Sequence, residues 1–180
     1  MKAYPMTMLR GLTGVALIAA WAPPLYAHVL LDQATPATVG ADYKAVFVVP
    51  HGCQGSATIR LRVQIPDGVI VLRTEPKDGW TVDETRGKYP AAYDQGGAKV
   101  SEGVKEVSWS GSKVPDKTRE EFTIDAYLTD ALKPDTSLFF PVVQDCEQGT
   151  SRWIEIPANG ELHSDELKRP APGVRLVPRS

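Results

Sequence analysis

Apolar and polar residues alternate along much of the chain with a period of two, which is the period of a β-strand. Within residues 57–65 the apolar positions fall on one face, and they are Ile59, Leu61, Val63 and Ile65. Within residues 121–129 the same pattern holds for Phe122, Ile124, Ala126 and Leu128. Both segments predict strands with one buried face and one solvent-exposed face. Residues 43–49 are apolar on both faces, which predicts a more central strand.

Shorter apolar runs predict further strands at residues 69–73, 80–83, 104–109, 138–143 and 152–156. Combinations of Pro, Asp and Gly separate these runs and predict turns, as in Pro66-Asp67-Gly68. Residues 86–103 are rich in Gly, Lys and Tyr and predict a long hairpin or loop. Many short strands with Gly/Pro turns, and almost no helical periodicity, predict an all-β fold: one immunoglobulin-like β-sandwich domain.

The two ends of the chain depart from this pattern. Residues 1–27 combine a weakly cationic start, an apolar run at 12–21, two prolines and a final alanine, as a secretory signal peptide does. The run is too short to span a bilayer comfortably, which disfavours a retained membrane anchor. We therefore expect cleavage after Ala27 and export to the periplasm. Alternation fades after Pro157, so we expect a sandwich at residues 28–157 and an extended Pro-rich tail at 158–180.

The net charge and the distribution of charged residues limit the classes of partner that the chain is expected to bind. The formal net charge is −2 at pH 7. A nucleic-acid-binding protein would carry a basic stripe, and a protein held on an anionic membrane surface would carry a polybasic segment. The chain has neither pattern, so we expect no nucleic-acid partner.

Cys53 and Cys146 are the only cysteines in the chain. An even number of cysteines in an exported protein predicts a disulfide bond, and two cysteines leave one connectivity. The alternative is that the two thiolates are copper ligands, which an oxidising compartment disfavours.

Cleavage after Ala27 would make His28 the first residue of the mature chain. A terminal histidine offers two nitrogen ligands, the α-amine and the imidazole Nδ1, which close a chelate ring on one metal ion. Nitrogen-rich sites favour Cu(II) among the first-row divalent ions. The mature chain offers no thioether ligand for Cu(I), because all three methionines lie in the first eight residues. The alternative is that His28 follows the cleavage site by accident.

His51 follows the predicted strand 43–49 after Pro50, which ends the strand because it lacks an N–H donor. If the segment that begins at His28 pairs antiparallel with this strand, His28 and His51 lie at the same edge of the sandwich. A disulfide at Cys53 would fix the segment that carries His51. The alternative is a solvated loop histidine.

Trp153 is the third candidate. In residues 152–156 we expect Ile154 and Ile156 to face the core, which places Trp153 on the opposite face. A Trp on that face needs a reason: it covers a second apolar layer, or it lies over a metal site. The disulfide would bring it close to His51. We therefore expect Trp153 to cover the metal site without being a ligand.

These motifs together resemble the YcnI-like periplasmic or extracellular copper-binding family, and the resemblance spans residues 28–157. It rests on Ala27-His28-Val29, Val49-Pro50-His51-Gly52-Cys53, Asp78-Gly79-Trp80, Val107-Ser108-Trp109-Ser110-Gly111, Phe140-Pro141-Val142-Val143-Gln144-Asp145-Cys146, Gly149 and Trp153. The resemblance implies an immunoglobulin-like sandwich that binds one Cu(II) through its N-terminal histidine.

The chain departs from the simpler members of that family at one point. In those members the N-terminal histidine is the only one, a carboxylate completes the site, and a Trp lies nearby. Where they have Val-Glu after Val-Pro, this chain has His51-Gly52. We therefore expect a histidine brace in which His28 binds through its amine and Nδ1 and His51 through one imidazole nitrogen, with no carboxylate selected as a further ligand.

Three functions are compatible with these residues. We favour a periplasmic Cu(II)-binding protein in copper homeostasis or delivery, not an enzyme, with another periplasmic copper carrier or a membrane copper protein as partner. The second is a copper-dependent oxidase like the lytic polysaccharide monooxygenases, whose copper also sits in a histidine brace on a β-sandwich. A Trp over the metal disfavours it. The third is a metal-free immunoglobulin-like interaction module.

Overall fold

A computed structural model describes residues 28–162 and 167–179, so the signal peptide expected at 1–27 lies outside the described residues. Within these ranges the regular elements are β-strands, and no helix is long and apolar enough to cross a membrane. In chain order they are β1 (Leu30–Leu31), β2 (Ala37–Thr38), β3 (Ala41–Val49), β4 (Thr58–Gln64), β5 (Val69–Thr74), β6 (Thr81–Gln95), β7 (Ala98–Val114), β8 (Glu120–Leu128), β9 (Ser137–Phe139), β10 (Val142–Cys146), β11 (Thr150–Trp153) and β12 (Gly173–Val177).

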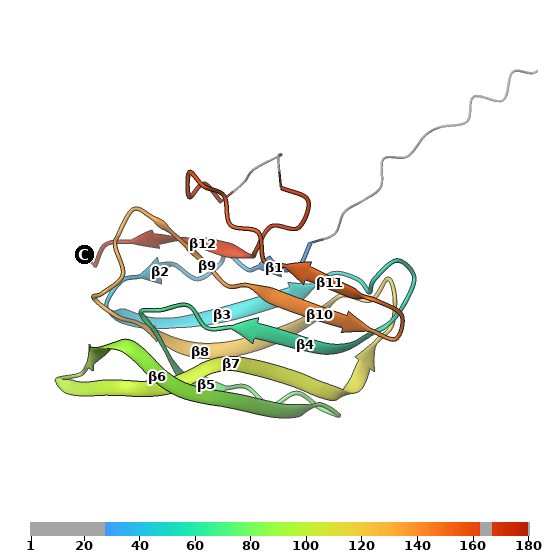
Figure 1. Ribbon diagram of the computed structural model, residues 1–180, viewed down its shortest axis with the longest axis horizontal. Helices are drawn as coiled ribbons and strands as arrows, with labels where there is room; N and C mark the ends of the chain where they lie inside the picture. Colours follow the sequence, from blue (N-terminus) through green and yellow to red (C-terminus); the bar gives the residue numbers. More distant parts are fainter. Residues whose placement is uncertain (1–27, 163–166, 180) are drawn as a thin grey trace, which may run out of the picture.

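Two main sheets pack face to face and enclose the core (Figure 1). One sheet has the strand order β1-β3-β8-β5, and the other has the order β11-β10-β4-β7-β6. A small third sheet, β2-β12-β9, lies along one side of this sandwich (Figure 1). The expected all-β sandwich is therefore confirmed. Its largest fully buried side chains are Trp109, Tyr43, Phe47, Phe122 and Phe140.

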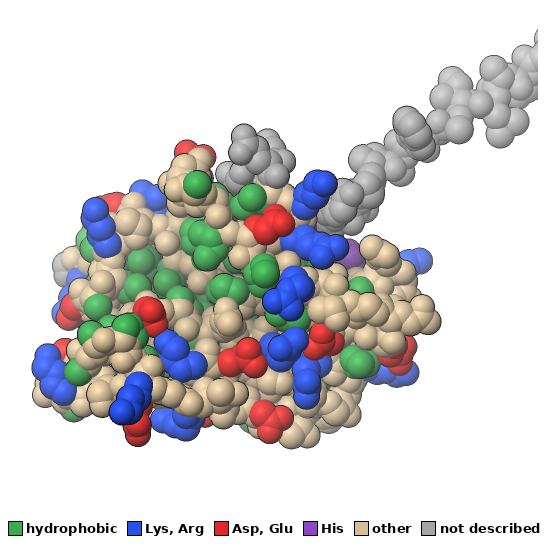
Figure 2. Space-filling model, in the orientation of Figure 1, with side chains coloured by type: hydrophobic (Ala, Val, Ile, Leu, Met, Phe, Trp, Pro, Cys, Tyr) green, Lys and Arg blue, Asp and Glu red, His purple; other side chains and the backbone are tan. Residues whose placement is uncertain are grey.

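The strands predicted from alternation are present. β3 and β8 pair antiparallel over nine residues, and the apolar residues of β8 are all buried. β4 differs from the prediction at its start, because a β-bulge between Thr58 and Arg60 shifts its register against β7. The bulge turns Thr58 into the core and leaves Ile59 38% exposed. On the face turned toward the viewer in Figure 2, cationic and anionic side chains are intermixed, as expected for wet strand faces.

The strand predicted at 138–143 is two strands. Pro141 separates β9 from β10, because a residue without an N–H cannot continue the hydrogen-bond ladder. β9 therefore joins the small sheet, whereas β10 pairs with β4 and β11 in the five-stranded sheet. This switch of sheet places Gln144 and Cys146 on an inner strand of the larger sheet, between β11 and β4.

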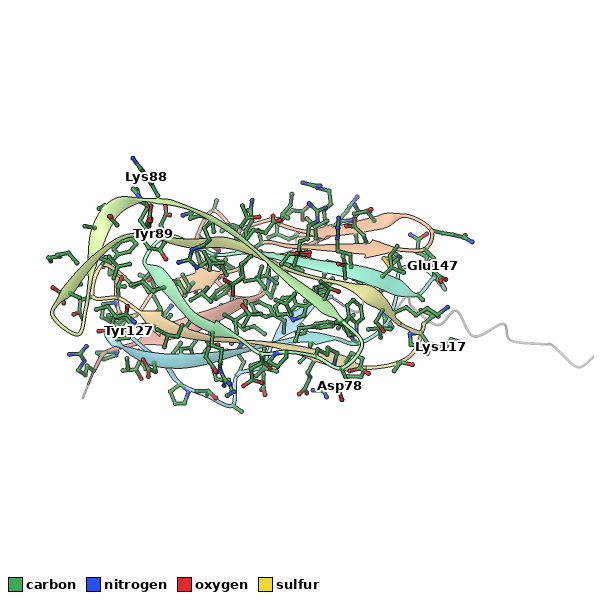
Figure 3. The ribbon with its side chains drawn as sticks, turned by 90° about the horizontal axis from the view of Figure 1, so that it is seen from below. Asp78, Lys88, Tyr89, Lys117, Tyr127 and Glu147 are labelled. Atoms are coloured by element: carbon green, nitrogen blue, oxygen red, sulfur yellow. A yellow bond between two sulfur atoms is a disulfide. The ribbon has the colours of Figure 1, made fainter. Side chains whose placement is uncertain are left out.

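The segment predicted as a long hairpin or loop is a hairpin of β6 and β7, with its turn at Gly96 and Gly97. β6 is the outermost strand of its sheet, and its pairing with β7 shifts register at Thr85/Arg86 and again between Lys88 and Tyr93. The hairpin packs a second apolar cluster that includes Tyr89, Tyr93 and the partly buried Tyr127. Figure 3 shows Tyr89 and Tyr127 at one end of the molecule and Lys117 at the other.

The prediction of an extended Pro-rich tail at residues 158–180 is wrong for residues 173–177. Residues 173–177 form β12, which pairs antiparallel with β9 and parallel with β2. Val174 and Leu176 are 3% and 1% exposed and belong to the main core. Three apolar residues between two prolines give too short a pattern to be recognised, but the pairing partners of this strand lie far away in the chain and supply the ladder. The domain therefore extends to the C-terminal strand.

An ion-pair cluster crosses the outer face of the four-stranded sheet. Asp125 of β8 is paired in register with Lys44 of β3 and Arg73 of β5. Arg73 donates to Asp125 from Nε at 3.1 Å and from a terminal nitrogen at 2.6 Å, and Lys44 Nζ lies 3.1 Å from the carboxylate. Desolvation acts to raise the pKa of Asp125, but the hydrogen bonds from Arg73 and Lys44 outweigh it, so the pKa is lowered.

Asp125→Asn should therefore change stability in a pH-dependent way. Because the carboxyl pKa is lower in the folded chain, its stabilisation is present above the ordinary value near 3.9 and is lost as the pH falls through the folded value. We expect the variant to lose about 0.5–1 kcal/mol at pH 7 and to match the parent chain near pH 2. Urea unfolding at both pH values measures this difference. An equal loss at both would contradict the ionic origin.

Candidate metal centre

His28 lies at the start of the described chain, just before β1. β1 pairs antiparallel with β3, with Leu30 opposite Val48 and Leu31 opposite Phe47. Continued by two residues, this register sets His28 opposite Pro50, the residue before His51. The antiparallel pairing expected from the sequence is therefore confirmed. Burial lowers the pKa of His28, which favours the neutral imidazole, the form in which it can bind a metal ion.

His51 is half-buried in the turn between β3 and β4. Its Nδ1 lies 2.5 Å from the carbonyl oxygen of Gly52. Because a carbonyl only accepts, Nδ1 carries the proton in this contact, and Nε2 is left with its lone pair free. Metal-binding histidines commonly donate their second ring N–H to a carbonyl in this way. The ring also lines a shallow cleft with Asp116 and Lys117.

Trp153 lies beside His28, but not on the face expected from the sequence. Its ring centroid is 5.3 Å from that of His28 with the planes tilted by 53°, and its side chain is 7% exposed. The prediction that Ile154 and Ile156 face the core is wrong, since they are 38% and 53% exposed. β11 ends at Trp153, which is opposite the buried Val142 and shares its face. The expected strand at 152–156 continues the alternation of faces beyond Trp153, where β11 ends, and this assigns Trp153 to the wrong face.

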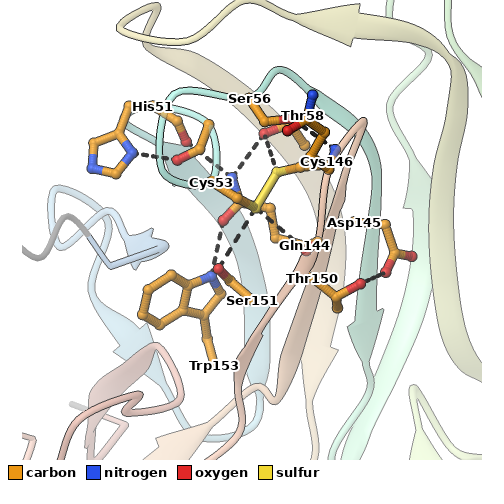
Figure 4. The surroundings of a disulfide bond; sticks show 12 residues. His51, Cys53, Ser56, Thr58, Gln144, Asp145, Cys146, Thr150, Ser151 and Trp153 are labelled. Atoms are coloured by element: carbon orange, nitrogen blue, oxygen red, sulfur yellow. Dashed lines mark hydrogen bonds between the residues drawn. A yellow bond between two sulfur atoms is a disulfide. The ribbon is translucent and has the colours of Figure 1, made fainter.

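The predicted disulfide is confirmed, since Cys53 and Cys146 are bonded with an S–S distance of 2.08 Å. It joins the turn that carries His51 to the end of β10. Next to it lies Gln144, a buried polar side chain that the sequence analysis did not select (Figure 4). Its position could have been noticed, because Val142, Gln144 and Cys146 alternate along one strand and the disulfide must face inward.

The structure thus gathers the candidate residues at one end of the sandwich, though in two groups. His28 contacts Trp153 and lines a mainly apolar cavity of about 320 Å³ with the segment Pro170–Gly173. His51 borders the separate cleft beside Asp116. Among residues 28–162 and 167–179, no group of three or more His, Cys, Asp or Glu side chains lies close enough together to hold a metal ion. A metal bound here would take its remaining ligands from the main chain or from water.

The α-amine of His28 is the main-chain ligand that cleavage after Ala27 would create. In the full chain this nitrogen belongs to a peptide bond, so it could act as a ligand only after such cleavage. With cleavage, this edge would offer an amine and two imidazoles, which are nitrogen donors, the type that Cu(II) favours.

Comparison with known proteins bears on the family and the fold. The family model described as "Domain of unknown function (DUF1775)" matches residues 28–176. The chain is similar to a crystal structure of an uncharacterized protein from Nocardia farcinica that has an immunoglobulin-like fold, with a TM-score of 0.61 and 22% identity over 83% of this chain and 98% of that chain. No curated protein matches the chain. The family match reaches into β12, in agreement with the domain boundary above.

Proposed function

Because the chain belongs to the DUF1775 family, the family of the YcnI-like proteins that its motifs resemble, we propose that the mature protein binds one Cu(II) ion at the edge formed by β1 and β3. The donors are the α-amine and imidazole of His28 and the Nε2 of His51. The observation that carries this proposal is the antiparallel pairing of β1 with β3, which brings the first residue of the mature chain next to the His51 turn. Copper is the cargo, and the protein acts in copper homeostasis or delivery.

The local chemistry supports the donor set. The contact of His51 Nδ1 with the Gly52 carbonyl leaves Nε2 as the free ligand atom. The lowered pKa of His28 favours the neutral imidazole that a metal requires. The disulfide ties the His51 turn to β10, so that this ligand is held by a rigid strand end.

Trp153 supports a binding protein over an oxygenase. Its indole packs against the His28 ring and is itself buried, so an apolar group adjoins the metal ligand where a reacting substrate would need access. We therefore propose a non-enzymatic role in the periplasm after export, with a periplasmic copper carrier or a membrane copper protein as partner. Oxidised products from polysaccharide, formed by copper-loaded protein with reductant and peroxide, would overturn this choice.

The decisive experiment compares two forms of the mature chain that begins at His28, one with a free α-amine and one with an acetylated α-amine. Acetylation removes one ligand and changes no side chain. We expect the Cu(II) affinity, measured by competition titration, to fall about hundredfold or more, because the chelate loses one of its linked donors. Unchanged affinity and an unchanged EPR spectrum would show that the amine is not a ligand.

His51→Ala in the free-amine chain tests the second imidazole. We expect its EPR spectrum to lose one nitrogen from the hyperfine pattern while His28 still binds the ion. His163 provides the matched control, because it is the remaining histidine of the chain, lies outside the described residues and belongs to no proposed ligand set. A His51→Ala spectrum identical to that of His163→Ala would remove His51 from the site.

A further inference from the structure

Gln144 is one of few buried polar side chains among the described residues, and it is 2% exposed. It lies on β10, between β4 and β11. Its Nε2 donates to the carbonyl oxygen of His51 at 2.9 Å and to Thr58 Oγ1 at 2.7 Å, and its Oε1 accepts from Trp153 Nε1 at 3.0 Å (Figure 4). Both amide hydrogens and the amide oxygen therefore have partners.

These three hydrogen bonds connect the two groups of candidate residues. The bond to the His51 carbonyl holds the main chain of the turn that carries one imidazole. The bond from Trp153 fixes the tilt of the indole, whose ring contacts His28. One side chain thus contacts the His51 turn directly and reaches His28 through a single intervening ring.

Glutamine is suited to this position because it combines two donors and one acceptor on a side chain of the required length. An ionised Glu would keep the acceptor for Trp153 and could accept from the Thr58 hydroxyl, but it would present an oxygen to the His51 carbonyl, which can only accept. Thr58 is available only because the bulge in β4 turns its hydroxyl inward. The bulge, Gln144 and Trp153 form one connected polar network inside an apolar core.

We propose that Gln144 is the positioning residue of the copper site: it sets where the His51 imidazole and the His28–Trp153 pair lie relative to each other. This inference rests on the proposed copper-binding function. Gln144 does not contact the ion. It restricts the movement of the His51 turn and of the indole, so that the two imidazoles are held in place before the metal arrives.

Gln144→Met tests this role, since Met has similar length and no hydrogen-bonding amide. We expect the Cu(II) affinity of the mature chain to fall about 10–100-fold, as for other residues that orient metal ligands. We also expect an altered EPR spectrum and, without copper, a shifted indole N–H resonance of Trp153. Gln144→Glu keeps the acceptor for the indole and loses both donors, so it should shift the His51 ring resonances more than the Trp153 resonance.

An effect of Gln144→Met on the position of the copper ligands must be separated from a general loss of protein stability. Thr129→Val is the matched control, because Thr129 is also buried, donates to the Gly68 carbonyl at 2.8 Å, and follows β8 at the end of the sheet away from Val49. It should lower stability without changing the copper spectrum. The double variant Thr58→Val, Gln144→Met removes both members of one buried pair and should recover stability but not copper affinity.

The outcomes distinguish the two proposals. If the wild-type mature chain binds no Cu(II), both the proposed function and the role of Gln144 fail. If the wild-type chain binds Cu(II) and Gln144→Met binds it with the same affinity and spectrum, as Thr129→Val does, only the role of Gln144 is overturned. Recovery of affinity together with stability in the double variant would likewise assign Gln144 to stability alone.

Discussion

A mature chain that ends at Pro157 will not reach the native fold. This truncation removes the residues first expected to form a tail, and with them β12, which pairs with β9 and β2. Val174 and Leu176 each contribute about 1.5–3 kcal/mol by burial, a large share of the roughly 5–15 kcal/mol that stabilises a typical domain. The near-UV circular dichroism of the truncated chain should be lost, and limited proteolysis should digest it completely.

Point variants on β12 separate the effect of losing a buried side chain from the effect of shortening the chain. Leu176→Ala should cost about 2–5 kcal/mol, because it leaves a cavity in the core. Arg175→Ala, on the exposed face of the same strand, should change stability by less than about 0.5 kcal/mol. If the truncated chain and Leu176→Ala both unfold at the temperature of the full chain, β12 is no part of the folding unit.

Removal of the disulfide should produce the second large effect. Cys53 and Cys146 are 93 residues apart, and closing a loop of that length stabilises a fold by about 4–5 kcal/mol in the chain-entropy treatment. For a domain of this size we expect the double variant Cys53→Ala, Cys146→Ala to unfold about 10–20 °C below the parent chain. Differential scanning calorimetry of the oxidised parent and the variant measures the shift.

The parent chain under reducing conditions is the natural control for this variant. Reduction and substitution should lower the unfolding temperature by similar amounts, because both open the same loop. A shift of under about 3 °C in the variant would mean that the unfolded chain gains little freedom when the bond is lost. The disulfide would then serve to hold the His51 turn against β10 more than to stabilise the whole domain.

Strands with one wet face were the most predictable part of the fold. β8 has strict alternation over nine residues, and each apolar member is buried. β4 follows the pattern until the bulge at Thr58, which no local pattern indicates because it arises from pairing with β7 and β10. β12 was missed because its ladder is made with strands distant in sequence, and its own three apolar residues form too short a pattern to predict a strand.

The positions of the two histidines could be predicted, because they follow from the order and pairing of two strands. The hydrogen-bond network behind them could not, because it depends on contacts between distant side chains. His28 and His51 were brought to one edge by a simple antiparallel argument, which the β1–β3 pairing confirms. Trp153 was assigned to the wrong face because the strand was extended beyond its last residue. Alternation with Val142 and Cys146 marks Gln144 as inward-facing, but no sequence pattern shows its three partners, which lie on other segments.

The outer position of β6 has a consequence for how these molecules behave when they meet in solution. A flat edge strand of 15 residues would expose a row of unpaired N–H and C=O groups to a neighbouring molecule. Here the two register shifts bend the strand, Pro90 removes one donor, and charged residues such as Glu84 and Lys88 occupy exposed positions. Two colliding molecules therefore find no continuous ladder to extend, so the long hairpin does not become a starting point for aggregation.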